Sequence, residues 1–399
     1  MDFALNETQL AWQMKARKFA AEEIAPMSLA RDAIADPHRT WDWEIIKKGS
    51  KLGFRTAVVP KKLGGEHEID FVTQALVMAE LAKADSAISK AFSQCWKWSH
   101  LIATVCTDDQ KKRFLAPFLA DDTYVLGKGI TEPNGGSDNR LPIDDPKAGV
   151  RLSAVRDGDH WILNGEKAFI ANGGVGRLFF LDARTNPNVP TRDGVTLFLV
   201  PSDTPGFRFG KQFNKSGWRF YMNAELIFEN ARVPHANVIG EVNGAYRKSS
   251  GDTSGGDLFG DLELAANAVG VCDAACEQSL ALARTAKQGG QLVKEQQSIQ
   301  LKINRMLMLT EALRSLVLRA AWEHDARIHS GAAALAMNYS TDVIQEVTEL
   351  NLDVHDAAYA SSDNRMASHA EKLVRDSFIW SHLAGDSVQR MRTGRRIIK

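Results

Sequence analysis

The chain has 399 residues and carries 49 basic and 49 acidic side chains, so its formal net charge is zero. This balance gives no reason to expect nucleic acid or an acidic membrane surface as a partner. No run of about 18 apolar residues is present, and the N-terminus lacks the charged-then-apolar order of a signal peptide. The composition therefore predicts a cytoplasmic protein with no membrane partner, built as one very large domain or as two to three ordinary ones.

The four cysteines predict neither a disulfide framework nor a metal site. Cys272 and Cys276 lie one helical turn apart, but no second pair of ligands follows them. We therefore expect no bound metal.

Helical patterns dominate the chain up to residue 123. Asn6 followed by Gln9 resembles a capping box at the start of the first helix. Ala25 and Pro26 are expected to end that helix, because proline lacks the N–H that a helix interior needs. The predicted helices cover residues 10–24, 41–52, 71–83, 87–106 and 108–119.

Short β-branched and aromatic runs separated by turns follow, from residue 124 to about 243. Asp157-Gly158 predicts a tight hairpin turn, and Asn164-Gly165 predicts a second turn. The predicted strands cover residues 150–155, 160–163, 167–171, 176–183, 194–200 and 225–228.

Helical periodicity returns after Gly244. Residues 258–285, 296–330, 332–358 and 369–384 are predicted helices, and an apolar stripe in the second one predicts bundle core or an oligomer seam. The fold class is therefore a multi-domain α+β protein. It has an N-terminal helical domain (1–123), a central antiparallel β domain (124–243) and a C-terminal four-helix bundle (244–399).

The stretch GITEPNGGSD at residues 129–138 is the most informative part of the sequence. Its three glycines allow tight turns and the close approach of a ligand, and Pro133 favours an extended residue before it. Free N–H groups on such a loop suit a ligand rich in acceptors, such as a flavin ring or a phosphate. A second stretch, WILNGEKAFIANG at residues 161–173, follows at short range.

These two stretches resemble the acyl-CoA dehydrogenase family of flavoproteins. Three further stretches share the resemblance: KLGFRTAVVPKKLGG at 51–65, DDQKKRFLAPFLA at 108–120 and KSGWRFYMNAELIFENARVPHANVIGE at 215–241. The resemblance extends over essentially the whole chain. It implies that FAD lies between the β domain and the C-terminal bundle. It also implies α,β-dehydrogenation of an acyl-CoA thioester, in which a carboxylate removes the α proton and the β hydrogen leaves as hydride.

The resemblance further implies specific contacts. Flavin contacts are expected at Ile130, Thr131, Gly136, Phe169 and Ala171. Ser137 is expected to meet both flavin and substrate, and Trp96 and Arg219 are expected near the substrate. Gln288 is expected at the flavin of a neighbouring subunit, and Gly385 and Asp386 at the cofactor. The family also implies a homotetramer, or at least a dimer, and an electron-transfer flavoprotein as a possible electron acceptor.

The chain departs from the family at the catalytic base. Ala384 stands where the usual glutamate is expected, and Gly260 stands where a second subgroup places its glutamate. Alanine and glycine cannot accept a proton. Asp261, Glu263 and Asp386 are the candidate substitutes, with Asp257 and His382 close by.

Two alternatives to dehydrogenation with a relocated base follow from this departure. One is other flavin chemistry on the same fold, such as a desulfination-like elimination or monooxygenation, which needs no glutamate. The other is a non-catalytic or half-site subunit of a heteromer.

Overall fold

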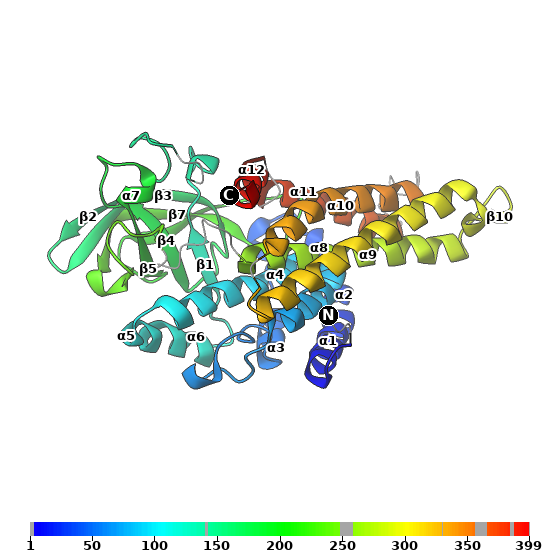
Figure 1. The fold of residues 1–399 in the computed structure, drawn as a ribbon, viewed down its shortest axis with the longest axis horizontal. Helices are drawn as coiled ribbons and strands as arrows, with labels where there is room; N and C mark the ends of the chain where they lie inside the picture. The colour runs from blue at the N-terminus through cyan, green and yellow to red at the C-terminus, as the bar shows by residue number, and fades with distance from the viewer. Residues whose placement is uncertain are drawn as a thin grey trace.

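The structure, a computed structural model, describes residues 4–139, 143–247, 258–328, 330–355, 365–383 and 387–398. An N-terminal helical domain, a middle β domain and a C-terminal helical domain follow one another along the chain, which confirms the predicted fold class. The β domain lies at one end of an elongated molecule, and the C-terminal helices reach the other end (Figure 1).

The N-terminal domain begins with the predicted capping box, in which Asn6 and Gln9 exchange side-chain and backbone hydrogen bonds. The expected stop at Pro26 is wrong. A π-helical turn over Ala20–Ile24 leads directly into the next helix, and Pro26 occupies the first turn of that helix, where no N–H is required. The helices are α1 (Glu7–Phe19), α2 (Ala25–Asp32), α3 (Trp43–Lys51), α4 (Phe71–Val105), α5 (Asp108–Gln110) and α6 (Ala116–Ala120).

Helix α4 joins two predicted helices through a kink at Asp85, whose backbone is extended (φ −162°, ψ 113°). The Asp85 carboxylate caps the second half of the helix by accepting from Ala87 N at 2.9 Å and Ile88 N at 3.2 Å. It also accepts from Ser28 Oγ at 2.6 Å and lies 3.2 Å from Lys372 Nζ. The kink is therefore fixed by contacts from both helical domains.

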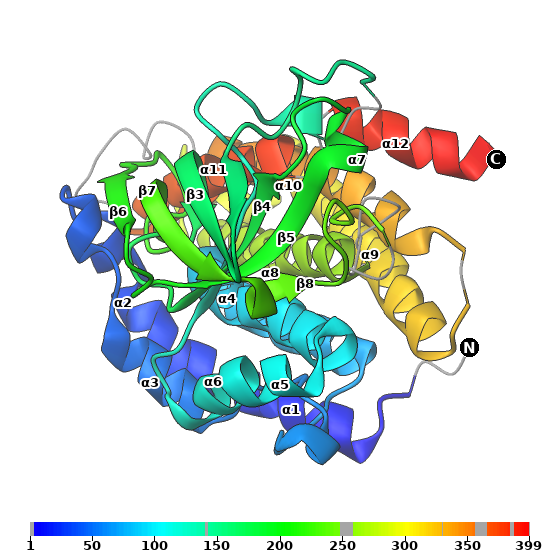
Figure 2. The same cartoon turned by 90° about the vertical axis from the view of Figure 1, so that its left-hand side faces the viewer.

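The β domain is one eight-stranded sheet in the order β6-β7-β3-β2-β4-β5-β8, with β1 paired to β4 (Figure 2). Most pairs are antiparallel, whereas β1 and β2 run parallel to β4. The patterns of β1, β6 and β8 were too short or too polar to be predicted. The strands are β1 (Leu126–Gly129), β2 (Ser153–Asp157), β3 (His160–Ala171), β4 (Leu178–Arg184), β5 (Val195–Pro201), β6 (Phe207–Gln212), β7 (Asn223–Pro234) and β8 (Val238–Ile239).

The hairpin at Asp157-Gly158 is confirmed, because it joins β2 to β3 and Gly158 has a φ of +56°. The second predicted turn, at Asn164-Gly165, is wrong. Strand β3 continues through it, and its pairing with β7 shifts register there, with Gly165 at a φ of +129°. The dipeptide forms a bulge because both neighbouring strands hold β3 in place.

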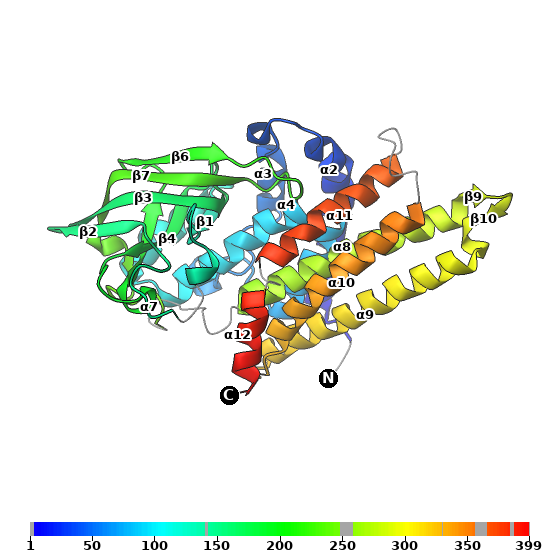
Figure 3. The same cartoon turned by 90° about the horizontal axis from the view of Figure 1, so that it is seen from above.

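The C-terminal domain is built from long helices packed side by side, and α8 also packs against α4 (Figure 3). The predicted stripe in α9 is confirmed as core, since Met306, Leu309 and Leu313 are buried. No helix in the described ranges is both long and apolar enough to cross a membrane. The helices are α8 (Leu258–Thr285), α9 (Gln297–Asp325), α10 (Ala332–His355), α11 (Arg365–Leu383) and α12 (Ser387–Ile398).

A tryptophan pair joins the exit of the β domain to the C-terminal helices. The Trp218 and Trp380 rings lie 5.1 Å apart at nearly right angles, and Trp380 Nε1 donates to Leu264 O at 3.0 Å. Asp376 accepts from Trp218 N at 2.6 Å and from Lys372 Nζ at 2.6 Å. These contacts fix residues 215–223 against α8 and α11.

Candidate active site

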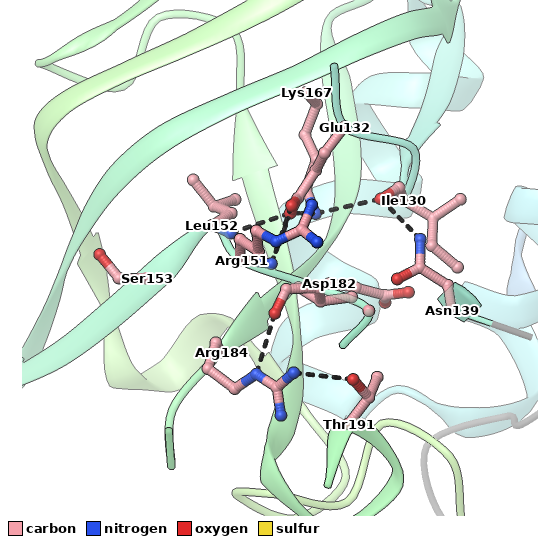
Figure 4. Close-up of polar contacts among 12 residues, drawn as sticks. Ile130, Glu132, Asn139, Arg151, Leu152, Ser153, Lys167, Asp182, Arg184 and Thr191 are labelled. Atoms are coloured by element: carbon pink, nitrogen blue, oxygen red, sulfur yellow. Dashed lines mark hydrogen bonds and ion pairs between the residues drawn. The ribbon is translucent and has the colours of Figure 1, made fainter. Parts of the chain in front are cut away.

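The two sequence stretches singled out above lie against each other. Ala168 N in β3 donates to Thr131 O at 2.9 Å, and Lys167 Nζ donates to Ile130 O at 3.2 Å. The loop after β1 is thus held along the edge of β3, as Figure 4 shows for its polar contacts. The predicted flavin-contact residues of both stretches therefore belong to one wall.

A buried ion pair anchors this wall. Glu132 accepts from Lys167 Nζ, Arg151 N and Leu152 N, each at 2.8 Å (Figure 4). Burial lowers the pKa of Lys167, and the charge and hydrogen bond of Glu132 oppose that shift. Because every partner comes from the chain itself, the pair fixes the loop and is not available to a ligand.

The tip of the loop is open. A Cβ at Gly136 would meet only Thr131 Cγ2, at 3.9 Å, and Ser137 beside it is exposed. Gly136 N donates to Asp138 Oδ1 at 2.8 Å, so this N–H supports the turn and does not face a ligand. The predicted contact at Gly136 would therefore be a close approach of backbone, with the Ser137 hydroxyl supplying the hydrogen bond.

Phe169 forms a fixed aromatic surface beside the loop. Its ring is 56% exposed, although the residue has a φ of +58° in a bulge of β3. The Phe213 ring stacks on it with centroids 4.0 Å apart, and Asn223 Nδ2 donates to Phe169 O at 2.8 Å. A left-handed backbone at a bulky residue is costly and is often found at functional sites. The arrangement suits contact with a planar ring.

The end of β3 leads from this wall into the interior. Asn172 N donates to Met222 O at 2.9 Å, and Asn172 Nδ2 donates to Leu126 O at 2.8 Å. Met222 and Asn223 thus lie against the end of β3, next to Phe169 and Ala171.

Two of the candidate bases lie on the first turns of α8, and both are buried. Glu263 Oε1 accepts from Lys90 Nζ and from Ser93 Oγ, two side chains of α4. Asp261 Oδ1 lies 3.4 Å from Gln389 Nε2 of α12. Asp386, Gly385, Ala384 and Asp257 lie outside the described residues.

Comparison with known proteins identifies the family. The N-terminal, middle and C-terminal domain profiles of the acyl-CoA dehydrogenase family match residues 6–122, 127–231 and 260–398. The chain belongs to the acyl-CoA dehydrogenase family. It is 30% identical to a short-chain specific acyl-CoA dehydrogenase of Megasphaera elsdenii and 29% identical to a probable acyl-CoA dehydrogenase of Bacillus subtilis, over the whole of each chain. The solved butyryl-CoA dehydrogenase of M. elsdenii superposes with a TM-score of 0.88 over all of both chains, at 29% identity.

The remaining predicted contacts lie away from the wall of this acyl-CoA dehydrogenase fold. Trp96 is buried in α4 and donates to Phe54 O. Arg219 donates to Asp32 O at 2.6 Å and to Lys215 O at 2.8 Å, so its guanidinium is used within the chain. Gln288 lies in the exposed hairpin at the far end of the C-terminal helices, beyond α9 (Figure 1).

Sequence reasoning missed Lys90, Ser93 and Phe213. A signal for Lys90 did exist, since it is the one charged residue between Asp85 and Lys97. A lone charge in such a stretch needs a buried partner, and Glu263 is that partner. Phe213 gave no signal, because its stacking on Phe169 depends on how the segment after β6 lies against the bulge in β3.

Proposed function

We propose that this chain is an FAD-dependent oxidoreductase that performs α,β-dehydrogenation of an acyl-CoA thioester with an atypical base. The observation that carries the proposal is the wall formed by Phe169 and the open Gly136–Ser137 tip, both held by contacts within the chain. These residues fit a flavin, since the ring offers a flat face and the tip leaves room for close approach. FAD, when bound, supplies the acceptor for the β hydrogen.

Each wall residue has a distinct role in the proposal. The Phe169 ring orients the planar cofactor, and the Ser137 hydroxyl donates a hydrogen bond to the cofactor or the thioester. The Glu132–Lys167 pair keeps the loop in position and so orients both. Such fixed groups act without reorganisation during the reaction.

Asp261 is the best supported base among the described residues. It is buried at the start of α8, beside Gly260, and near Gln389 of the helix that follows Ala384. The start of α8 and the start of α12, which flank the two family positions in sequence, therefore meet at this carboxylate. Glu263 is less suitable, because Oε1 already accepts from Lys90 and Ser93 and a proton taken up at Oε2 would leave the Lys90 ammonium buried without its counter-charge.

The experiment is anaerobic reduction of the purified yellow protein by short acyl-CoA thioesters, followed as bleaching of the flavin. Asp261→Asn is expected to slow bleaching by about 10²- to 10⁴-fold, as for loss of a general base. Glu263→Gln and Asp386→Asn test the other candidates. Asp353→Asn, at a largely exposed position, serves as the control. Bleaching that is equally fast in all of these variants would exclude a relocated carboxylate base.

The two alternatives predict different outcomes in the same assay. A flavin that is not bleached anaerobically, together with product formation that requires oxygen or a sulfinate substrate, would support other chemistry on this fold. A colourless protein that does not take up FAD would support a non-catalytic subunit and would contradict the proposed function.

We further propose a homotetramer, or at least a dimer, with an electron-transfer flavoprotein as electron acceptor. The position of Gln288, far from the β domain of its own chain, supports this, since it could meet a flavin only in another copy. Light scattering that finds only monomers would contradict the assembly.

A further inference from the structure

A line of buried polar side chains runs between α4 and α8, where an apolar contact would be expected. Ser86, Lys90 and Ser93 follow one another at helical spacing on α4, and Glu263 and Asn267 do so on α8. Each of the five is at least nine-tenths buried. We call these five residues, together with Tyr221, the polar seam.

The partners within the seam do not satisfy all of its polar atoms. Within the described residues, Glu263 Oε1 accepts from both Lys90 and Ser93, whereas no hydrogen bond reaches Oε2. Asn267 Nδ2 donates to Glu263 O at 3.1 Å, but its Oδ1 has no partner there. Ser86 Oγ also has none. Each such group costs on the order of 1–3 kcal/mol if it stays unpaired.

Tyr221 connects the seam to the candidate active site. Its hydroxyl is buried and has no hydrogen-bond partner in the described part of the chain. Tyr221 packs in the same core cluster as Ala91 of α4 and Leu264 of α8, which are sequence neighbours of Lys90 and Glu263. Burial, and then the charge of Glu263, raise the pKa of Tyr221. Its neighbour Met222 accepts from Asn172, the residue that ends the Phe169 wall. Tyr221 is therefore one residue away from the contact that joins this segment to the end of β3.

The free positions of the seam define the chemistry of a ligand. Glu263 Oε2 and Asn267 Oδ1 can only accept, whereas the Tyr221 hydroxyl can donate or accept. Lys90 and Glu263 cancel in charge, so a charged ligand group would be buried without a counter-charge. An apolar ligand would leave the acceptors unpaired. A neutral group that both donates and accepts fits best.

We infer that the polar seam binds a neutral hydrogen-bonding substituent, such as a hydroxyl, on a short acyl group. This inference rests on the proposed function, because it assumes that an acyl thioester enters behind the Phe169 wall. It adds the substrate class: a hydroxylated acyl chain binds better than the plain chain of equal length.

The test uses two thioethers that cannot be dehydrogenated, S-butyl-CoA and S-(4-hydroxybutyl)-CoA, so that binding is separated from the base. Dissociation constants with the holoprotein are measured by calorimetry, and thermal unfolding midpoints with each ligand provide a second measurement. The hydroxylated ligand is expected to bind about tenfold more tightly, the equivalent of one net hydrogen bond.

Three variants assign the preference to the seam. Tyr221→Phe removes one hydroxyl and keeps the ring, and should reduce the preference to about threefold or less. Lys90→Met with Glu263→Leu should reverse it, because the hydroxyl then meets an apolar surface. Ser89→Ala is the matched control on α4: Ser89 is also buried, but its hydroxyl donates to Met78 O at 3.2 Å, so the preference should not change.

The outcomes separate this inference from the proposed function. Equal binding of the two ligands to the unsubstituted protein would overturn the inference and leave the acyl-CoA function standing. A preference that survives in both Tyr221→Phe and the double variant would also overturn it. Failure of both ligands to bind would overturn the inference together with the acyl-CoA function.

Discussion

Two buried lysine–glutamate pairs, one in the wall and one between α4 and α8, differ in how completely the chain satisfies their hydrogen-bonding positions. Glu132 receives hydrogen bonds from Lys167 and from two backbone N–H groups. Glu263 receives its bonds from Lys90 and Ser93 on one oxygen only. Both pairs carry the same charges at similar burial.

The difference indicates what each pair does. Burying two charges costs several kcal/mol, and the cost is offset only when the remaining hydrogen-bonding positions are filled. The hydrogen-bonding positions of Glu132 are filled by groups of its own chain, so this pair holds a loop in place. The second carboxylate oxygen of Glu263 receives no hydrogen bond from the described residues. This is what we expect of a pair that also binds a ligand.

The largest expected effect is at the satisfied pair. Lys167→Met leaves the Glu132 carboxylate buried without its counter-charge and should lower the free energy of unfolding by about 4 kcal/mol. Equilibrium unfolding in denaturant measures this loss. Lys128→Met is a comparison, since Lys128 is more exposed beside Asp182 and should cost less. Equal losses in the two variants would contradict the role assigned to Lys167.

Removing both charges of each pair separates the two cases further. Glu132→Leu with Lys167→Met should still cost about 2–3 kcal/mol, because Arg151 N and Leu152 N lose their acceptor. Lys90→Met with Glu263→Leu should change stability by only about 1 kcal/mol in either direction, since few other groups lose a partner. If the two double variants proved equally stable, the contrast between the pairs would be wrong.

A smaller effect is expected at the wall itself. Phe169→Ala removes an exposed ring, so it should leave the unfolding free energy almost unchanged while weakening FAD binding about tenfold. Fluorescence titration of the apoprotein with FAD measures the affinity. Val155→Ala, at a similarly exposed strand position, is the control. An unchanged FAD affinity would remove Phe169 from the proposed site.

The last prediction concerns pH and Lys215, whose Nζ lies 5.5 Å from the centroid of the Tyr221 ring. Burial lowers the pKa of Lys215 to about 7; the nearby Asp376 opposes this shift and Arg219 adds to it. Between about pH 7 and 10 the unfolded chain then binds more protons than the folded one, so this residue makes stability rise with pH. Comparing unfolding free energies of the parent and Lys215→Met should show that rise only in the parent. A parallel pH dependence in both would refute it.

Helix and strand patterns predicted the three-domain fold, because apolar periodicity is a local property of the chain. The prediction failed where the local conformation depends on more than the local sequence pattern. At Pro26 a π-helical turn leads into the next helix, and at Gly165 two neighbouring strands hold the chain in a bulge. The residues of the wall could be singled out because they lie in two short stretches, and their contact with a flavin stays a prediction. The seam could not, since it requires the pairing of Lys90 with Glu263, which only the packing of α4 on α8 creates.

The kink in α4 bears on how this molecule is assembled. Asp85 caps the second half of that helix while binding Lys372, a residue from near the other end of the chain. The N-terminal half of the polypeptide thus lacks one neighbour of this aspartate until almost all of the chain has been synthesised, and contacts so distant in sequence form slowly. An isolated fragment that ends before α11 should accordingly be prone to aggregation, whereas the full-length chain can close around the kink in a single cooperative step.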